Sequence, residues 1–224
     1  MKSLRKDELL LYLPYLKKEL VGKHLSGITL LEESAIAFRP SGKGAKKFVI
    51  DLENENPLVY YEGEPIEVNS LSSPFFEALK REIPNPYVQE ISLLNDDRIL
   101  ALDLLIVNKV FKEEKRSLIL ELFPANANLL ILDENKKIIL AFRSKGYESK
   151  RPLMKGLLYE APKKVDIQKE KSPISFDIDK YLAEAKQVEK VLLEKRKKAK
   201  FAPFFKEYKR QIKRAERKID AINK

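Results

Sequence analysis

One stretch, residues 117–162, predicts more about the structure of this chain than any other part of the sequence. Leucines at positions 118, 120 and 122 alternate with other residues, which predicts a β-strand. The apolar run Asn128–Leu132 predicts a second strand, and Ile138–Phe142 a third, after a turn at residues 133–135. Short apolar runs separated by turn residues are typical of an antiparallel sheet.

An irregular segment follows these strands, with Arg151, Gly156, Tyr159 and Pro162 as its marked positions. From spacing alone, a hairpin followed by a linker is the simpler interpretation. Six residues, however, resemble the pattern of the amino-terminal domain of the NFACT family: Glu121, Asn128, Arg151, Gly156, Tyr159 and Pro162. That family includes RqcH and NEMF, and its bacterial members are also called fibronectin-binding proteins. The loop before Asn128 reads PANAN, where the family usually has Gly, Arg, His and Ser before the Asn.

This resemblance implies an α+β fold, a mostly antiparallel β sandwich similar to the amino-terminal domain of Fpg/MutM, with flanking helices. We expect an NFACT-N-like domain over residues 1–165, a linker over 166–177 and a basic helical coiled-coil extension over 178–224. The resemblance covers roughly residues 9–200. It identifies an abbreviated member, without the helix-hairpin-helix and carboxy-terminal RNA-binding domains that full-length relatives carry.

The remaining helices and strands are predicted from hydrophobic periodicity and from cap and turn residues. Apolar residues at helical spacing predict a helix over Asp7–Leu20, which Pro14 either bends or causes to begin later. A second helix is predicted to begin at Ser73 and Pro74, with Phe75, Leu79 and Ile83 on its buried face. Two more helices, residues 178–200 and 204–223, are expected to be split at Pro203. Alternating runs predict strands over residues 28–32, 35–38, 48–52, 58–61, 87–94 and 98–106.

The positive charge is concentrated at the carboxy-terminal end. The formal net charge is +10, and residues 178–224 hold 16 Lys and Arg against 7 Asp and Glu. A nearly neutral domain with a strongly basic helix predicts a polyanionic partner. The alternative is a solvated lysine-rich helix without a partner. The basic residues singled out are Lys195, Arg196, Lys197, Lys198, Lys209, Arg210, Lys213 and Arg214.

Asp97 and Arg98 belong to the turn predicted at residues 95–98, between the strands 87–94 and 98–106, and are expected at a rim of the sheet. The NFACT resemblance implies that this pair binds tRNA, and a guanidinium held by a neighbouring carboxylate is a suitable fork for a phosphate. Without the family, a surface ion pair is the simpler interpretation. Lys80 and Arg81 also match a basic pair of the family, although any amphipathic helix carries lysines opposite its leucines.

Composition excludes several classes of function. The chain has no cysteine and a single histidine, His24, so we expect no metal site, no cofactor and no thiol chemistry. Fpg-type glycosylases attack with an amino-terminal proline, whereas this chain begins Met1-Lys2-Ser3, and GKGAKK lacks the Ser or Thr that ends a phosphate-binding loop. We therefore expect no enzyme and no DNA partner. No export signal or membrane span is predicted, which favours the cytoplasm.

Two functions remain open. The first, implied by the resemblance to RqcH, is an RNA-binding factor of ribosome quality control. Its partners would be tRNA and the large ribosomal subunit with its rRNA. It would bind the subunit when peptidyl-tRNA obstructs it. Relatives support untemplated tailing of stalled nascent chains. The second is a non-catalytic interaction adaptor, of the coiled-coil or fibronectin-binding type, which has lost tRNA recruitment and uses the extension to bind a coiled-coil protein partner.

Overall fold

The computed structural model describes residues 2–53, 55–61, 72–108, 110–163 and 175–222. The chain divides into two compact units, Met1–Leu182 and Ala183–Lys224. Most of the predicted linker, residues 166–174, lies outside the described residues. The domain boundaries expected from the sequence therefore stay predictions.

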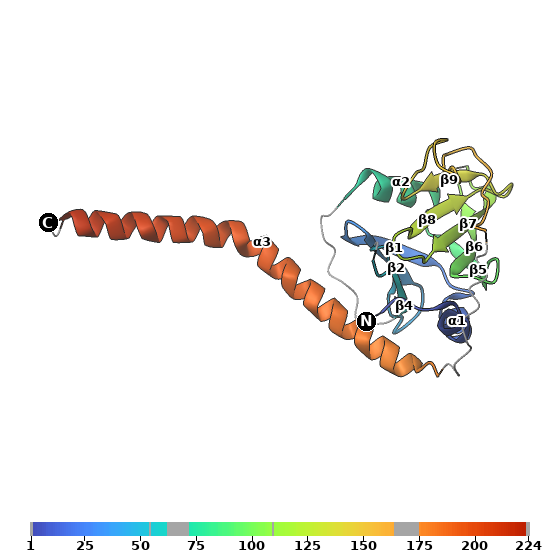
Figure 1. The fold of residues 1–224 in the computed structure, drawn as a ribbon, viewed down its shortest axis with the longest axis horizontal. Helices are drawn as coiled ribbons and strands as arrows, with labels where there is room; N and C mark the ends of the chain where they lie inside the picture. The colour runs from blue at the N-terminus through green and yellow to red at the C-terminus, as the bar shows by residue number, and fades with distance from the viewer. Residues whose placement is uncertain (1, 54, 62–71, 109, 164–174, 223–224) are drawn as a thin grey trace. The chain divides into compact units, whose positions relative to one another are not determined.

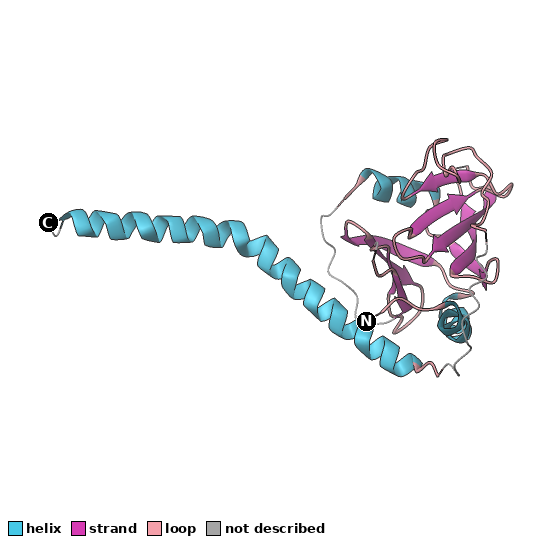
Figure 2. Cartoon of the chain, in the orientation of Figure 1, coloured by secondary structure: helices cyan, strands magenta, loops and turns pink. Residues whose placement is uncertain are grey.

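The first unit contains two antiparallel sheets and two helices (Figures 1 and 2). Each sheet is a meander whose spatial order follows the sequence, so neighbouring strands are joined by short turns. The first sheet consists of β1 (Leu25–Glu32), β2 (Ala35–Pro40), β3 (Phe48–Asp51) and β4 (Leu58–Tyr61). The second consists of β5 (Tyr87–Leu93), β6 (Ile99–Val107), β7 (Glu113–Glu121), β8 (Asn128–Leu132) and β9 (Ile138–Ala141). The predicted α+β fold is confirmed.

Local signals fix both helices of this unit. Helix α1 (Lys6–Leu20) begins where Glu8 Oε2 accepts the backbone N–H of Arg5 at 2.7 Å, and it continues through Pro14 without a delayed start. Helix α2 (Pro74–Glu82) begins where Ser73 Oγ accepts the N–H of Phe76 at 3.2 Å. The prediction that Phe75 faces the core was wrong. Phe76 is buried instead, and Phe75 packs edge-on against Phe142.

The five-stranded sheet is buried on both faces at β8, where all five residues are buried, whereas β5 and the first half of β7 include exposed residues. One face carries a cluster that includes Ile99, Ile119 and Leu130, and the segment after β9 covers this cluster with Leu153 and Tyr159. Residues 143–162 therefore belong to the folded unit, and the linker interpretation is excluded. The sheet could not bury this face without that segment.

The hairpin between β5 and β6 has a fixed tip. Asn95 and Asp96 both have positive φ (56° and 48°), and the N–H of Asp97 donates to Leu94 O at 3.2 Å, as in a type I′ turn. The tip is bonded on two sides. Lys6 Nζ lies 3.0 Å from the carboxylate of Asp96, and Asn95 Nδ2 donates to Pro162 O at 2.8 Å.

Helix α3 (Ile178–Ile222) is continuous, so the predicted split at Pro203 was wrong. A proline removes one backbone hydrogen bond and strains the preceding turn, but a helix of 45 residues retains the other bonds on either side. The first turn of α3 belongs to the first unit, because Tyr181 is buried and donates its hydroxyl to Val59 O at 3.0 Å. No helix in the described part of the chain is long and apolar enough to cross a membrane.

Candidate functional site

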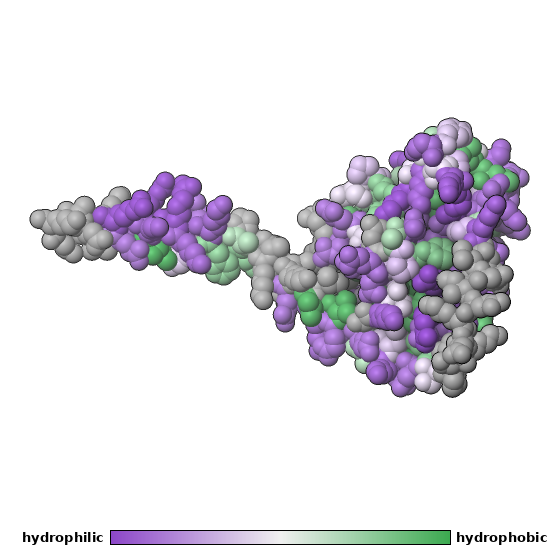
Figure 3. Space-filling view, viewed as in Figure 1, coloured by the Kyte–Doolittle hydropathy of each residue, from purple (hydrophilic) through white to green (hydrophobic). Residues whose placement is uncertain are grey.

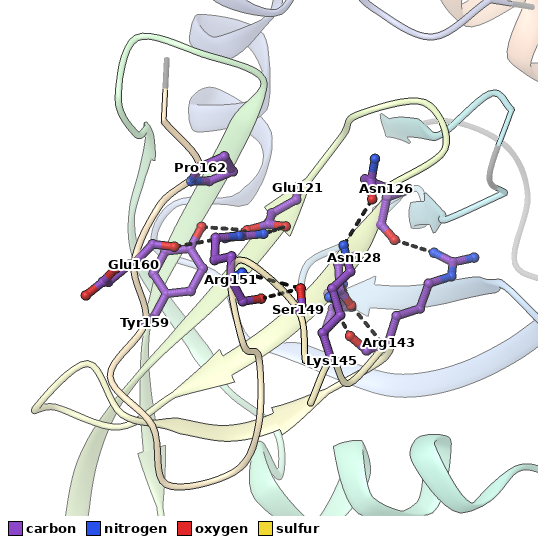
Figure 4. Close-up of polar contacts among 12 residues, drawn as sticks. Glu121, Asn126, Asn128, Arg143, Lys145, Ser149, Arg151, Tyr159, Glu160 and Pro162 are labelled. Atoms are coloured by element: carbon purple, nitrogen blue, oxygen red, sulfur yellow. Dashed lines mark hydrogen bonds and ion pairs between the residues drawn. The ribbon is translucent and has the colours of Figure 1, made fainter. Parts of the chain in front are cut away.

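Glu121, Arg151 and Tyr159 meet in one hydrogen-bonded cluster (Figure 4). Glu121 ends β7, and its side chain is 1% exposed. Arg151 donates through both terminal nitrogens to the two carboxylate oxygens at 2.7 and 2.6 Å, and Tyr159 donates its hydroxyl to Glu121 Oε1 at 2.9 Å. A bidentate guanidinium pair of this kind satisfies a buried carboxylate that would otherwise be destabilising. The cluster fastens the segment 143–162 to the sheet.

The titration of these groups follows from their burial. Burial, together with the neighbouring Glu121 carboxylate, raises the pKa of Tyr159 well above its ordinary value. The Tyr159 hydroxyl therefore stays protonated and remains a donor at neutral pH.

Gly156 has a different role, in the backbone of the same segment. With φ +89° it takes a backbone conformation that other residues rarely adopt. It lies in a turn that is closed by the hydrogen bond from the N–H of Leu157 to Met154 O.

Asn128 is the second buried polar residue of this region, and it fixes the start of the same segment. Its Nδ2 donates to Arg143 O at 2.9 Å, and its Oδ1 accepts the N–H of Arg143 at 2.8 Å. The side chain thus extends the pairing of β8 with β9 beyond Ala141, where the strand ends. Since Glu121 and Asn128 are both buried and bonded within the unit, we assign them to the scaffold rather than to a contact surface.

Arg143 joins the two sheets. Its guanidinium donates to Leu52 O at 2.8 Å, directly after β3, and to Ala127 O in the loop before β8. Burial lowers the pKa of Arg143, and no described carboxylate forms an ion pair with it. Lys145, two residues later, donates to Asn126 Oδ1 at 3.0 Å in the same loop. Neither Arg143 nor Lys145 was identified from the sequence as a candidate site residue. The signal that was available is the presence of two cations directly after a predicted strand.

The structure corrects the geometry predicted for Asp97 and Arg98. Asp97 Oδ1 accepts the backbone N–H of Arg98 at 2.7 Å, so its carboxylate does not hold the guanidinium. The guanidinium lies instead over the ring of Phe123, 5.2 Å from its centre. The reason is local: after the type I′ turn, Asp97 folds back on the next peptide, as aspartates do in turns. Both side chains are half-exposed.

The basic residues of α2 form contacts within their own helix. Lys80 Nζ lies 3.6 Å from Glu77 and over the ring of Phe76, and Arg81 lies 3.7 Å from Glu82. Surface pairs of this type contribute little to stability and leave the cations accessible. Their role in RNA binding stays a prediction.

The second unit presents two stripes along α3. Aromatic and aliphatic side chains at spacings of four, three and four form an apolar stripe in which Phe205 and Tyr208 are both 64% exposed: Phe201, Phe205, Tyr208 and Ile212. Cations at the same spacing form a stripe on roughly the opposite face: Lys206, Arg210, Lys213 and Arg217, all exposed. Figure 3 shows apolar and hydrophilic surface side by side on this helix. Eight basic residues of this helix were singled out from the sequence. The structure does not describe the side chains of residues 195–198, and it shows the other four as exposed: Lys209, Arg210, Lys213 and Arg214.

No arrangement typical of catalysis or metal binding is found among the described residues. The ring of His24 donates from Nδ1 to Asn85 O at 3.1 Å and packs edge-on against Tyr87. No group of three or more His, Cys, Asp or Glu in the described part of the chain could hold a metal ion. That the chain is not an enzyme stays a prediction.

Comparisons with known proteins concern the family and the fold. The family described as NFACT N-terminal and middle domains matches residues 13–198. The fold is similar to the amino-terminal part of the fibronectin/fibrinogen-binding protein from Streptococcus suis (TM-score 0.68, 21% identity, 73% of this chain and 62% of that chain). It is also similar to the amino-terminal domain of fibronectin-binding protein PavA from Streptococcus pneumoniae (0.66, 19%, 79% and 66%) and to the fibrinogen-binding protein from Staphylococcus aureus (0.62, 19%, 71% and 56%). No curated protein sequence matches the chain. The chain spans 56% to 66% of the length of these three structures.

Proposed function

The chain belongs to the family of NFACT N-terminal and middle domains, and from this premise we propose that it is an RNA-binding factor of ribosome quality control. In this proposal it binds tRNA and the large ribosomal subunit that peptidyl-tRNA obstructs. It acts in the cytoplasm, uses no cofactor and performs no chemistry of its own, because the ribosome supplies the peptidyl transfer.

The observation that supports this proposal best is the cationic stripe of α3. Four exposed cations, from Lys206 to Arg217, follow one face of the helix over 11 residues, which is roughly 16 Å at 1.5 Å per residue. Only Arg210 among them has an acidic neighbour, Glu207 at 3.6 Å, within the described residues. A regular row of exposed cations suits the repeating phosphates of an RNA backbone.

A second contact is proposed at the β5–β6 turn. Arg98 is half-exposed at the edge of the sheet, and its guanidinium has no acidic partner among the described residues, so its donors are available to a phosphate or a base edge. The backbone that carries it is held on both sides, by Lys6 through Asp96 and by Pro162 through Asn95. A cation on a fixed turn loses less conformational entropy on binding than one on a free loop.

The test is co-sedimentation of the purified chain with large ribosomal subunits, with and without prior ribonuclease treatment. The proposal predicts that the chain sediments with intact subunits and that ribonuclease releases it. It also predicts weaker co-sedimentation when the four cations of the α3 stripe are replaced by glutamine. If the chain still co-sediments after ribonuclease treatment and after the glutamine substitutions, the contact is with ribosomal protein and not with RNA.

The apolar stripe of α3 supports a second candidate, an interaction adaptor. Phe205 and Tyr208 are largely exposed at heptad-like spacing, as in a helix that binds a partner helix. The three similar structures are named as fibronectin- or fibrinogen-binding proteins. A protein of that kind is therefore another candidate class of partner for an adaptor. Replacing Phe205 and Tyr208 with serine separates the two candidates, because an adaptor loses its partner whereas RNA binding through the opposite face persists.

A further inference from the structure

Two arginines of the segment 143–162 lie in very different electrostatic surroundings. Arg151 is neutralised by a bidentate pair with Glu121. Arg143 is also partly buried, yet the groups that accept from it are two backbone carbonyls, Leu52 O and Ala127 O. Carbonyls can be satisfied by a neutral donor, and the guanidinium also lies over the ring of Phe142, 4.7 Å from its centre. The charge of Arg143 therefore meets an aromatic face but no carboxylate among the described residues.

A second cation lies beside this one. Lys145 donates to the side chain of Asn126, and Arg143 donates to the backbone of Ala127, so both cations meet neighbouring residues of one loop. Both are also held by their own backbones. Residue 143 exchanges two hydrogen bonds with Asn128, and residue 145 exchanges two with Leu153. Both cations therefore contact the same loop, and neither has an acidic partner among the described residues.

The free hydrogen-bonding capacity of this cluster is rich in donors. Among the described residues, acceptors are found for two of the five N–H groups of the Arg143 guanidinium and for one of the three of the Lys145 ammonium. Since Asn126 Oδ1 accepts from Lys145, its amide NH2 is also left to donate, and Figure 4 shows Lys145 and Arg143 both reaching the loop that carries Asn126. A site that is rich in donors and carries two positive charges suits an anionic ligand that accepts hydrogen bonds.

From this geometry we propose that Arg143, Lys145 and Asn126 form a phosphate-binding site that takes a backbone phosphodiester of RNA. The site rests on the proposed RNA-binding function and gives it a defined location in the first unit. Both cations come from the segment after β9 and donate to the PANAN loop, which carries no basic residue of its own.

The first test measures binding of a fluorescein-labelled U20 RNA to the full chain between 0.05 and 0.3 M KCl. The Lys145→Gln variant is compared with Lys155→Gln, which removes the same charge from an exposed lysine of the same segment. One lost phosphate contact on a single strand lowers the slope of log K against log salt by about 0.7, which corresponds to about fivefold weaker binding at 0.1 M salt. We expect this change for Lys145→Gln and none for Lys155→Gln. Equal slopes in the two variants would overturn the site.

The second test does not depend on RNA binding. Inorganic phosphate is added to the 15N-labelled wild-type chain at constant ionic strength, with KCl as the reference, while the Arg143 Nε–H and Asn126 side-chain NH2 signals are followed by NMR. Saturable shifts of both signals are expected, and shifts equal to those with chloride would overturn the site. If phosphate binds here but U20 RNA does not bind the chain at all, the site stands and the proposed function fails. A loss of binding to phosphatidylglycerol vesicles in Lys145→Gln, without a loss of RNA binding, would overturn the assignment to RNA.

Discussion

Arg151 donates through both terminal guanidinium nitrogens to the carboxylate of Glu121, which lies 30 residues earlier in the sequence and is 1% exposed. This pair connects the end of β7 to the segment that covers the sheet. Removing one partner of a buried ion pair leaves a buried charge without compensation, which is far more destabilising than loss of a surface pair.

We therefore expect Arg151→Met to lower the free energy of unfolding by about 3–5 kcal/mol. The matched control is Lys155→Met, an exposed cation of the same segment, which should change stability by less than about 0.5 kcal/mol. Urea unfolding followed by circular dichroism measures both. A loss below about 1 kcal/mol for Arg151→Met would show that the pair does not hold the segment.

Tyr159→Phe tests the third member of the cluster. It removes the bond from the hydroxyl to Glu121 Oε1 and retains the ring, so we expect a loss of about 1–2 kcal/mol near neutral pH. The raised pKa of Tyr159 gives the pH dependence its sign. The hydroxyl contributes fully below pH 10, its unfolded pKa, and loses that contribution as the pH rises above this value. The difference between wild type and variant should be constant from pH 6 to 9 and shrink above pH 10; a difference that grows there would contradict the assignment.

Asp51 gives a second prediction that depends on pH. Its Oδ1 accepts from Ser34 Oγ at 3.1 Å and from the N–H of Glu53 at 3.0 Å, while burial raises the pKa of its carboxyl. A folded pKa above the unfolded value means that ionisation destabilises the fold as the pH rises. Asp51→Asn retains both bonds without the charge, so we expect thermal unfolding at pH 7 to shift upward by about 2–4 °C. At pH 3 we expect no shift, and an upward shift of equal size at both pH values would exclude the charge as its cause.

Most of the strands were predictable because their apolar residues alternate over short runs between turn residues. The residues of β4 and β8 were predicted without error, and most other strands within about three residues at either end, whereas β7 begins at Glu113, at least four residues before the predicted start. The errors have physical causes. Pro203 was read as a helix break, although tolerance of an internal proline depends on the rest of a long helix. Phe75 and Phe76 are adjacent, and periodicity alone could not decide which faces the core.

The candidate sites were predictable only in part. Glu121, Arg151 and Tyr159 were identified as a family pattern, but their contact joins residues 30 and 38 positions apart, which no local signal encodes. The same holds for Arg143, which bonds Leu52 O across 91 positions. The Asp97–Arg98 prediction failed in its geometry, because a carboxylate next to a guanidinium in sequence can also cap a backbone N–H.

The corrected turn yields a prediction for tRNA. Arg98→Ala should weaken tRNA binding by about 1–3 kcal/mol with little loss of stability, because Arg98 is half-exposed. Asp97→Ala should also weaken it, although a negative charge is removed, because Asp97 fixes the peptide that carries Arg98. Lys80→Ala, on the surface of α2, is the control. Titration of labelled tRNA at one salt concentration measures all three, and tighter binding by Asp97→Ala would exclude a dedicated tRNA contact at this turn.

The central claim, that the chain binds RNA and uses the cationic stripe of α3, is tested most directly by the salt dependence of tRNA binding. The wild type is compared with a variant in which Lys206, Arg210, Lys213 and Arg217 are all glutamine, substitutions that a helix tolerates well. Each phosphate contact on a duplex contributes about 0.9 to the slope of log K against log salt, so the account predicts that the slope decreases by roughly 3 to 4. An unchanged slope, or a wild type that does not bind tRNA at 0.1 M salt, would contradict it.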